Sequence, residues 1–305
     1  MNEASVTRSM PNTTGLPMVG MISPLWIEPG FASGMQSTLV PPLAYQGFGL
    51  EAYGESIPVD EVGGDLVDVV ARDNEVIAYV ADVSGHGLRA GVLMAMIKTA
   101  VRYGLLLGQP VTKLLADLNR VLPSVKQANM FVTFAMLRFD GSGTAEYISA
   151  GHVPLLQYRW RQGDVVRHSL PQLPLGLFAD AEYATQRISY EAGDVFVLVS
   201  DGVVETGEDR NEEFGFAKLE QVLVDSRGLS VAELAKAIYT ELHIHGPQQD
   251  DQTVLLVRAS KPGATDEDAM PPSQWNRTAE SAESLAAEWE KLLDGLAADL
   301  SADLS

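Results

Sequence analysis

Four aspartates, far apart in the sequence, each stand where an apolar run meets a turn. They are Asp65, Asp82, Asp201 and Asp250, and each has a glycine or a second acid nearby. Aspartate and glycine are also the commonest turn residues, so any single motif of this kind is equally well explained by a turn. The four together, each joining a strand-like segment to a turn, indicate a divalent-metal site.

A site of this kind needs bound cations. Two carboxylates about 4 Å apart repel each other by roughly 4 kcal/mol at an effective dielectric of about 20, so four that converge must be neutralised. Oxygen ligands in a chain with five histidines and no cysteine favour magnesium, manganese or calcium over zinc or copper. The missing cysteines also exclude a mechanism that uses a cysteine nucleophile.

Seven motifs in a fixed order give the chain a family resemblance over roughly residues 47 to 258. The motifs are Val62-Gly63-Gly64-Asp65-Leu66-Val67-Asp68, Ala81-Asp82-Val83-Ser84-Gly85-His86-Gly87 followed by Ala90, Phe131-Val132-Thr133, Ala150-Gly151-His152, Pro174-Leu175-Gly176, Ser200-Asp201-Gly202 with Glu205, and Asp250-Asp251-Gln252-Thr253. Together they resemble the SpoIIE-type branch of the PP2C-like (PPM) metal-dependent serine/threonine protein phosphatases.

The resemblance implies an enzyme that hydrolyses phosphoserine or phosphothreonine on a protein, with two Mn²⁺ or Mg²⁺ ions as cofactors. It also implies an α+β fold, a PP2C-like four-layer α/β/β/α sandwich of two antiparallel sheets flanked by helices. Phosphate monoesters hydrolyse very slowly unaided. A pair of cations about 3.5 to 4 Å apart can lower the pKa of a shared water and neutralise the phosphoryl oxygens.

The same resemblance assigns the metal ligands. Asp82 would bridge the two ions, and the backbone carbonyl of Val83 would complete the second site. Asp201 and Asp250 would hold the first ion. Asp82 and Asp201 are therefore also the candidate catalytic carboxylates.

Four further acids have less definite roles. Asp65 would bind a metal directly or through a metal-bound water. Asp251 is expected to support the site from behind, because related eukaryotic enzymes have asparagine there, yet either member of the Asp250-Asp251 pair could turn inward. Asp68 and Glu205 match the family pattern without a role that the sequence explains.

The proton donor for the leaving group is not fixed by the motifs. Eukaryotic relatives carry a histidine two residues after the bridging aspartate, where this chain has Ser84. His86 is the candidate catalytic acid, although Gly85-His86-Gly87 also opens the next helix, and a role at the helix start is at least as well supported. His152 precedes a strand, and we interpret it as structural.

Composition limits the partners and the compartment. The net charge of −20 argues against nucleic acid, since phosphate backbones are bound through lysine and arginine. No apolar run reaches the length of about 18 residues that a membrane span needs, and no basic start followed by an apolar core opens the chain. Together with the missing cysteines, these features favour the cytoplasm.

Four regions follow from the pattern of prolines and charges. Residues 1–45 contain six prolines and are expected to form a loosely ordered leader. Residues 46–259 are the expected phosphatase domain, and the apolar content of 46% is enough for one substantial core. Residues 260–277 are a predicted linker, and residues 278–305 a predicted acidic amphipathic helix.

Short β-rich runs and longer helical patterns alternate inside the expected domain. The predicted strands are 66–71, 76–81, 131–139, 145–149, 195–199 and 253–257. The predicted helices are 88–107, one whose first turn begins at Pro110, and one from Val231 to about His243 that starts with the capping box of Ser230 and Glu233. Strand runs interrupted by pairs of helices favour an α+β arrangement.

Five apolar residues recur at helical spacing in the C-terminal region. They are Leu285, Trp289, Leu292, Leu296 and Leu300, with acids on the opposite face. Two interpretations stay open: the helix packs on the catalytic domain, or it docks a partner or regulates the enzyme. The acidic face makes binding to an anionic membrane unfavourable.

The resemblance also implies a partner, a phosphorylated STAS-domain anti-sigma-factor antagonist in a bacterial partner-switching circuit. Two other functions remain as alternatives. One is a catalytically silent, metal-binding regulator that binds a phosphoprotein. The other is a two-metal phosphodiesterase or nuclease, which the acidic charge and the ordered motifs disfavour.

Overall fold

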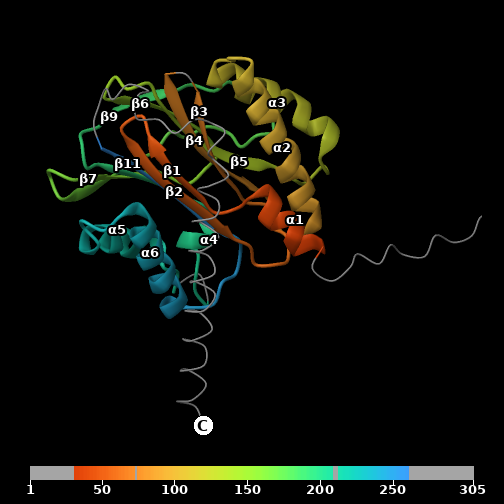
Figure 1. The fold of residues 1–305 in the computed structure, drawn as a ribbon. Helices are drawn as coiled ribbons and strands as arrows, with labels where there is room; N and C mark the ends of the chain where they lie inside the picture. Colours follow the sequence, from red (N-terminus) through yellow and green to blue (C-terminus); the bar gives the residue numbers. More distant parts are fainter. Residues whose placement is uncertain (1–30, 73, 209–211, 261–305) are drawn as a thin grey trace, which may run out of the picture.

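Two antiparallel β-sheets lie face to face in the computed structural model of this chain, and helices cover both outer faces (Figure 1). The structure describes residues 31–260 except 73 and 209–211. The arrangement confirms the predicted α+β class and its four layers of helix, sheet, sheet and helix. Among the described residues, no helix is both long enough and apolar enough to span a bilayer.

The six-stranded sheet has the order β1-β2-β11-β10-β7-β8, and all neighbouring strands are antiparallel. Its strands are β1 (Leu43–Gly47), β2 (Leu50–Ile57), β7 (Leu155–Arg159), β8 (Asp164–His168), β10 (Val195–Val199) and β11 (Gln252–Ala259). Strand β11 inserts between β2 and β10, with Ile57 opposite Gln252 and Leu50 opposite Ala259. The last strand of the described chain therefore completes the sheet that the first strands begin.

The five-stranded sheet has the order β3-β4-β5-β6-β9 and is also antiparallel throughout. Its strands are β3 (Leu66–Arg72), β4 (Glu75–Val83), β5 (Val132–Phe139), β6 (Thr144–Ala150) and β9 (Gln186–Ser189). Strand β4 is buried over nearly its whole length, as its unbroken apolar run indicates. It ends at the candidate site, where Asp82 lies opposite Thr133 of β5.

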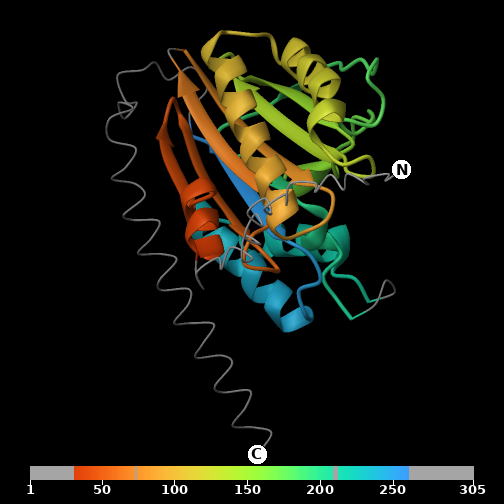
Figure 2. The ribbon, with the colours of Figure 1, turned by 90° about the vertical axis from the view of Figure 1, so that its right-hand side faces the viewer.

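Two helices cover the outer face of each sheet, and the described residues form six helices in all. The helices are α1 (Phe31–Leu39), α2 (Leu88–Leu106), α3 (Val111–Val125), α4 (Asp201–Val204), α5 (Gly215–Asp225) and α6 (Val231–His245). Helix α2 lies along β3 and β4, with α3 beside it (Figure 2). Helix α6 contacts β2 and β11, and α5 contacts β8 on the opposite side of the molecule.

Aromatic side chains join the two sheets in the half of the sandwich away from Asp82, since Phe139 lies opposite Val76 at the start of β4. Phe139 of β5 and Phe196 of β10 meet edge to face, with ring centroids 5.5 Å apart, and Tyr190 contacts both. All three residues are buried. Because such pairs stabilise a core beyond their buried area, they fix the two sheets against each other, and with them the strand ends that carry the site.

The predicted helices agree with the structure in position and in start signals. Helix α6 begins with the predicted capping box, in which the Ser230 hydroxyl accepts from the Glu233 amide at 3.2 Å and the Glu233 carboxylate accepts from the Ser230 amide at 2.8 Å. Helix α3 begins directly after Pro110. Local sequence signals therefore set these helix ends.

Residues 31–45, part of the predicted loosely ordered leader, differ from that expectation. They form helix α1 and most of strand β1, and β1 pairs with β2 from Leu43 opposite Gly54 to Gly47 opposite Leu50. The predicted domain start at residue 46 falls inside this strand. The prolines at 41 and 42 interrupt the chain only between the helix and the strand, where a turn is needed anyway. The remaining leader, the linker after Ser260 and the C-terminal helix lie outside the described residues.

A buried ion pair fastens α2 to the five-stranded sheet. The Asp68 carboxylate of β3 accepts from Arg102 of α2 through both of its oxygens, each at 2.7 Å, and from the Tyr79 hydroxyl at 2.7 Å. The Asp68 side chain is buried, whereas Arg102 is half exposed. This gives Asp68 a structural role that the sequence did not explain.

We predict that Asp68→Ala lowers the free energy of unfolding by about 2 kcal/mol, because it leaves the buried Tyr79 hydroxyl without its partner. Urea unfolding followed by circular dichroism measures the change. Asp164→Asn, which removes one partner of an exposed ion pair with Arg159, is the control and should leave the midpoint nearly unchanged. Equal midpoints for Asp68→Ala and wild type would contradict the fastening role.

Candidate active site

The four aspartates singled out by the sequence lie at one end of the sandwich. Asp65 directly precedes β3, and Asp82 is the next-to-last residue of β4. Asp201 opens α4 two residues after β10 ends, and Asp250 lies two residues before β11 begins. Because adjacent strands are antiparallel, the start of one and the end of its neighbour meet at the same edge. This pairs the segments within each sheet, and the Thr253–Asp65 hydrogen bond and the repulsion of Asp82 by Asp201 and Asp250 show that the two pairs lie at the same end of the sandwich.

Two glycines allow the segments to approach closely. A Cβ atom on Gly64 would lie 2.6 Å from the carbonyl oxygen of Val83, and one on Gly202 would lie 2.2 Å from that of Asp251. Both distances are shorter than van der Waals contact permits. Glycine beside Asp65 and beside Asp201 is thus required for packing, which explains two of the motif positions in physical terms.

The carboxylates act on each other electrostatically. Partial withdrawal from water, followed by repulsion from Asp201 and Asp250, raises the pKa of Asp82 to about 8. Burial and then repulsion from Asp82 raise the pKa of Asp65 well above its usual range. Burial and then Asp250 raise the pKa of Asp201. A bound cation would relieve this shared cost, because it favours the charged forms.

Glu205 belongs to the same electrostatic cluster. Its charge adds to the repulsion that raises the pKa of Asp82. It directly follows α4, one turn beyond Asp201, so the short helix carries both acids toward the site. The sequence marked this residue without giving it a role.

Asp251 turns away from its neighbour and holds a loop. Its two carboxylate oxygens accept from the backbone amides of Val59, at 2.8 Å, and Gly64, at 2.7 Å. The side chain is buried, and its Oδ2 would lie 2.5 Å from a Cβ atom on Gly63. Both oxygens thus fix the loop that leads to Asp65, which agrees with the expected supporting role.

Asp65 is held by the start of β11. The Thr253 hydroxyl donates to Asp65 Oδ2 at 2.6 Å, and this hydrogen bond lowers the pKa of Asp65 against the larger effect of burial. The Ser200 hydroxyl accepts from the Thr253 amide at 2.9 Å and donates to the Asp251 carbonyl at 3.0 Å. Serine and threonine beside the acids thus orient the carboxylates, a function the sequence analysis missed.

The donor set of this cluster suits a hard divalent cation, because it consists of carboxylate and backbone oxygens. In the part of the chain that the structure describes, no group of three or more histidine, aspartate or glutamate side chains is arranged so that it could hold a metal ion. The fold brings the acidic segments to one end of the sandwich, and their oxygen donors are of the type that a hard divalent cation binds, although the described side chains do not already form a ligand set.

His86 lies at the mouth of the cluster, on the turn between β4 and α2. Gly85 and Gly87 on either side have positive φ angles of 86° and 80°, which the tight turn requires. Helix α2 begins after Gly87 without a side-chain cap. The exposed His86 ring instead pairs through Nδ1 with Asp60, and this contact raises the pKa of His86. The contacts of His86 include no side-chain cap of α2, and its role as a catalytic acid stays a prediction.

The side chains of Ser84 and His152 form hydrogen-bond contacts within the fold. The Ser84 hydroxyl accepts from the Phe131 amide at 2.9 Å, which ties the end of β4 to the segment before β5. His152 Nδ1 lies 2.7 Å from the hydroxyl oxygen of Thr133, the residue opposite Asp82. Burial lowers the pKa of His152 to about 4, so the ring is neutral at pH 7. These contacts agree with the structural interpretation of His152.

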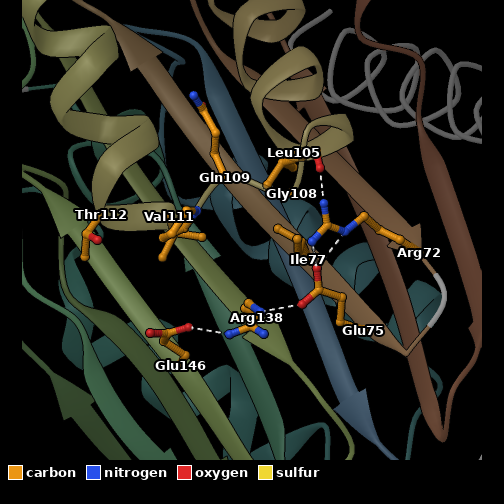
Figure 3. A pocket seen from close by; sticks show the side chains of 11 residues that line it. Arg72, Glu75, Ile77, Leu105, Gly108, Gln109, Val111, Thr112, Arg138 and Glu146 are labelled. Atoms are coloured by element: carbon orange, nitrogen blue, oxygen red, sulfur yellow. Dashed lines mark hydrogen bonds and ion pairs between the residues drawn. The ribbon is translucent and has the colours of Figure 1, made fainter.

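A polar cavity of about 260 Å³ lies at the opposite end of the five-stranded sheet (Figure 3). Its charged residues are already paired, since Glu75 bonds to both Arg72 and Arg138, and Arg138 also bonds to Glu146 at 2.8 Å. The Arg72 guanidinium also donates to the carbonyl of Leu105 at the end of α2. These contacts join the β3–β4 hairpin to the end of α2, and they are separate from the aspartate cluster.

A protein-family model described as Stage II sporulation protein E (SpoIIE) matches residues 72–260, more than half of the chain. The match begins after Asp65, so the place of Asp65 in the site rests on the contacts above. Among curated proteins, the chain is 29% identical over 237 residues to the phosphoserine phosphatase RsbU of Bacillus subtilis (strain 168). That alignment covers 74% of this chain and 68% of RsbU.

Solved structures share the fold. The RsbU and RsbW domains of Rv1364c from Mycobacterium tuberculosis match with a TM-score of 0.66 at 22% identity, over 74% of this chain and 64% of that one. The catalytic domain of the serine threonine protein phosphatase PstP, solved with two manganese ions, matches with a TM-score of 0.54 at 18% identity, over 70% of this chain and 100% of that one. These likenesses confirm the predicted PP2C-like sandwich.

The raised pKa of Asp82 predicts a pH effect on stability in the presence of a chelator. An aspartate whose folded pKa lies near 8 binds its proton in the folded state at pH values where the unfolded state has lost it. Wild type should therefore gain stability as the pH falls from 8 to 6, whereas Asp82→Asn lacks this term. The stability advantage of the variant should shrink by about 1–2 kcal/mol over that range.

Urea unfolding of both proteins at pH 6, 7 and 8 with EDTA measures this difference. Glu208→Gln, at an exposed site, serves as a control that changes one charge without touching the cluster. An unchanged difference between Asp82→Asn and wild type across the pH range would show that Asp82 is not under electrostatic strain.

Proposed function

The chain belongs to the SpoIIE family of PP2C-like protein serine phosphatases, and from this premise we propose that it hydrolyses phosphoserine or phosphothreonine on a protein by a two-metal mechanism. The observation that carries the proposal is the mutual electrostatic effect of Asp82, Asp201 and Asp250 at one end of the sandwich. Such a cluster costs free energy in the fold unless a cation offsets it. Binding of Mn²⁺ or Mg²⁺ would offset that free-energy cost, because the cation stabilises the charged carboxylates.

The ligand assignment follows the arrangement of the acids. We assign Asp82, Asp201 and Asp250 as direct ligands, the Val83 carbonyl as a further ligand, and Asp65 as a ligand or as an acceptor for metal-bound water. When bound, the two ions would activate a water molecule and neutralise the phosphoryl oxygens. Asp251 is proposed as a positioning residue, because both of its oxygens bind the loop before Asp65.

The chain's own residues then decide orientation and proton transfer. Thr253 fixes Oδ2 of Asp65, and the Ser200 side chain also bonds to this carboxylate, so the two hydroxyls orient it. The pair of His86 and Asp60 stands at the mouth, and the raised pKa of His86 keeps its ring protonated to higher pH than an ordinary histidine. A protonated ring there can donate to the serine oxygen that leaves.

The proposed substrate is a phosphorylated protein, and within that class a STAS-type anti-sigma-factor antagonist. The proposal is supported by the similarity to RsbU, itself a phosphoserine phosphatase, and by the RsbU-like domain in Rv1364c. The exposed position of His86 agrees with a substrate that approaches from the surface, as a phosphorylated segment of a folded protein would. We propose the cytoplasm as the compartment, where such phosphoproteins occur.

The first test is phosphate release from a phosphoserine protein by the purified chain with Mn²⁺. Turnover should appear with metal, stop with EDTA, and fall by at least about 100-fold in Asp82→Asn and in Asp201→Asn, which is more than supporting residues lose. Asp164→Asn, far from the cluster, should keep wild-type activity. Metal binding without turnover would contradict the enzyme and favour the silent regulator, and turnover only on a phosphodiester would favour a nuclease.

The second test concerns His86. If His86 is the general acid, kcat on a phosphoserine peptide should fall as the pH rises through its raised pKa, and His86→Gln should lose that limb with about 100-fold lower kcat. p-Nitrophenyl phosphate is the matched substrate, because nitrophenolate leaves without a proton and should be affected far less. Asp60→Asn should move the limb to lower pH. Equal losses on both substrates would contradict the acid role.

A further inference from the structure

Helix α2 presents an apolar stripe on its outer face. Five large apolar side chains, from 43% to 79% exposed, follow one side of the helix. They are Leu88, Val92, Met96, Tyr103 and Leu106. Their spacing of three, four or seven residues places them on one face. Exposed apolar side chains gathered in a stripe usually mark an interaction surface, whereas scattered ones need no explanation.

The stripe includes a shallow apolar hollow beside α1. The hollow has a volume of about 590 Å³ and is lined by Leu39, Val92, Ala95, Met96, Thr99, Ala100 and Tyr103. Leu39 of α1 forms one wall, and Lys98 fixes that end of α1 by donating to the Leu39 carbonyl. The hollow thus lies between two packed helices and can take a further row of apolar side chains.

The charges around the stripe are basic. Helix α2 contains Arg89, Lys98 and Arg102 and no acidic residue. Arg89 is exposed on one side of the stripe, while Arg102, on the other side by helical spacing, is half exposed and already paired with Asp68. In a chain with a net charge of −20, this is a local exception. A surface complementary to this face of α2 would therefore carry an apolar stripe with acidic residues beside it.

The C-terminal part of the sequence carries that pattern. Residues 285–300 repeat Leu285, Trp289, Leu292, Leu296 and Leu300 at helical spacing. Residues 280–300 contain six acids and one base. Two of the acids, Glu288 and Asp299, are three turns apart and would stand beside the stripe in a helix. At about 1.5 Å per residue this stripe is about 22 Å long, close to the length of about 27 Å on α2.

We propose that residues 285–300 form a helix that docks along the apolar face of α2 in the same chain. The 24 residues between Ser260 and Leu285 would, as a flexible tether, have a root-mean-square span of roughly 27 Å. Docking would cover the apolar stripe of α2 and bring the acids of residues 285–300 near the basic face that carries Arg89. The alternative occupants of this face are a second copy of the chain and a different protein.

The position of α2 gives docking a consequence that rests on the proposed function. Helix α2 begins six residues after Asp82 and two after His86, so Leu88 and Val92 lie beside the mouth of the site. Docking there would place the C-terminal segment beside the turn that carries His86. The docking itself does not require the protein to be an enzyme.

The absence of cysteine from the sequence permits a direct test in the full chain. Met96→Cys and Leu292→Cys place one thiol at the middle of each stripe, so they meet whichever direction the docked helix runs. Mild oxidation should give an intramolecular disulfide, seen as a faster band on a non-reducing gel and a monomeric mass. Its rate should exceed that of the control pair Ile244→Cys and Leu292→Cys by at least about fivefold, since tethering alone gives both pairs a similar effective concentration.

Ile244 is a fair control because it is exposed on α6, on the opposite side of the molecule. Urea midpoints of the reduced proteins verify that both pairs are folded. A disulfide-linked dimer as the main product would overturn the proposal in favour of a second copy. Equal rates for the two pairs, or no disulfide with Met96→Cys, would also overturn it, and the face would then be left for a different protein. These outcomes are independent of phosphatase activity.

Discussion

The repulsion among carboxylates at one end of the sandwich is the constraint on which the rest of the structure depends. Asp82, Asp201 and Asp65 all have pKa values raised by burial and by one another. Such charges would separate if the chain between them were free. Two sheets that share an aromatic core hold the strand ends in place, so the stability of the core is what keeps the acids together.

A second set of contacts decides which way each carboxylate faces. The neighbours Asp250 and Asp251 have different roles. Both oxygens of Asp251 accept hydrogen bonds from backbone amides, whereas the charge of Asp250 raises the pKa values of Asp82 and Asp201. Helix α2 links this end of the molecule to its flank, since it starts at the site and is fastened by Arg102 to Asp68.

Sequence patterns predicted the parts of the fold with strong local signals. The buried strand β4 and helix α6, with its capping box, stand out because an apolar run or a cap is visible in a few residues. Strands β1, β2, β7, β8 and β9 were not predicted. Strands β8 and β9 are short and only partly buried, so their pairing depends on neighbours distant in sequence, and β2 contains Glu51, Gly54 and Glu55, residue types that are uncommon in strands. The motifs pointed to the acids that the fold gathers at one end, and their role as metal ligands stays a prediction. The partners that orient them, such as Thr253 for Asp65 and Asp60 for His86, appear only when the chain is folded.

The most direct measurement is the location of Mn²⁺ by anomalous diffraction from crystals of the protein grown with the metal. The account predicts two anomalous peaks at the end of the sandwich, bridged by Asp82 and with Asp201 and Asp250 in contact with one of them. Asp82→Asn crystals should lose at least one of the peaks, because the bridging ligand is gone. Full metal occupancy elsewhere on the protein, with no peak among these three carboxylates, would contradict the central claim that the fold gathers them to bind metal.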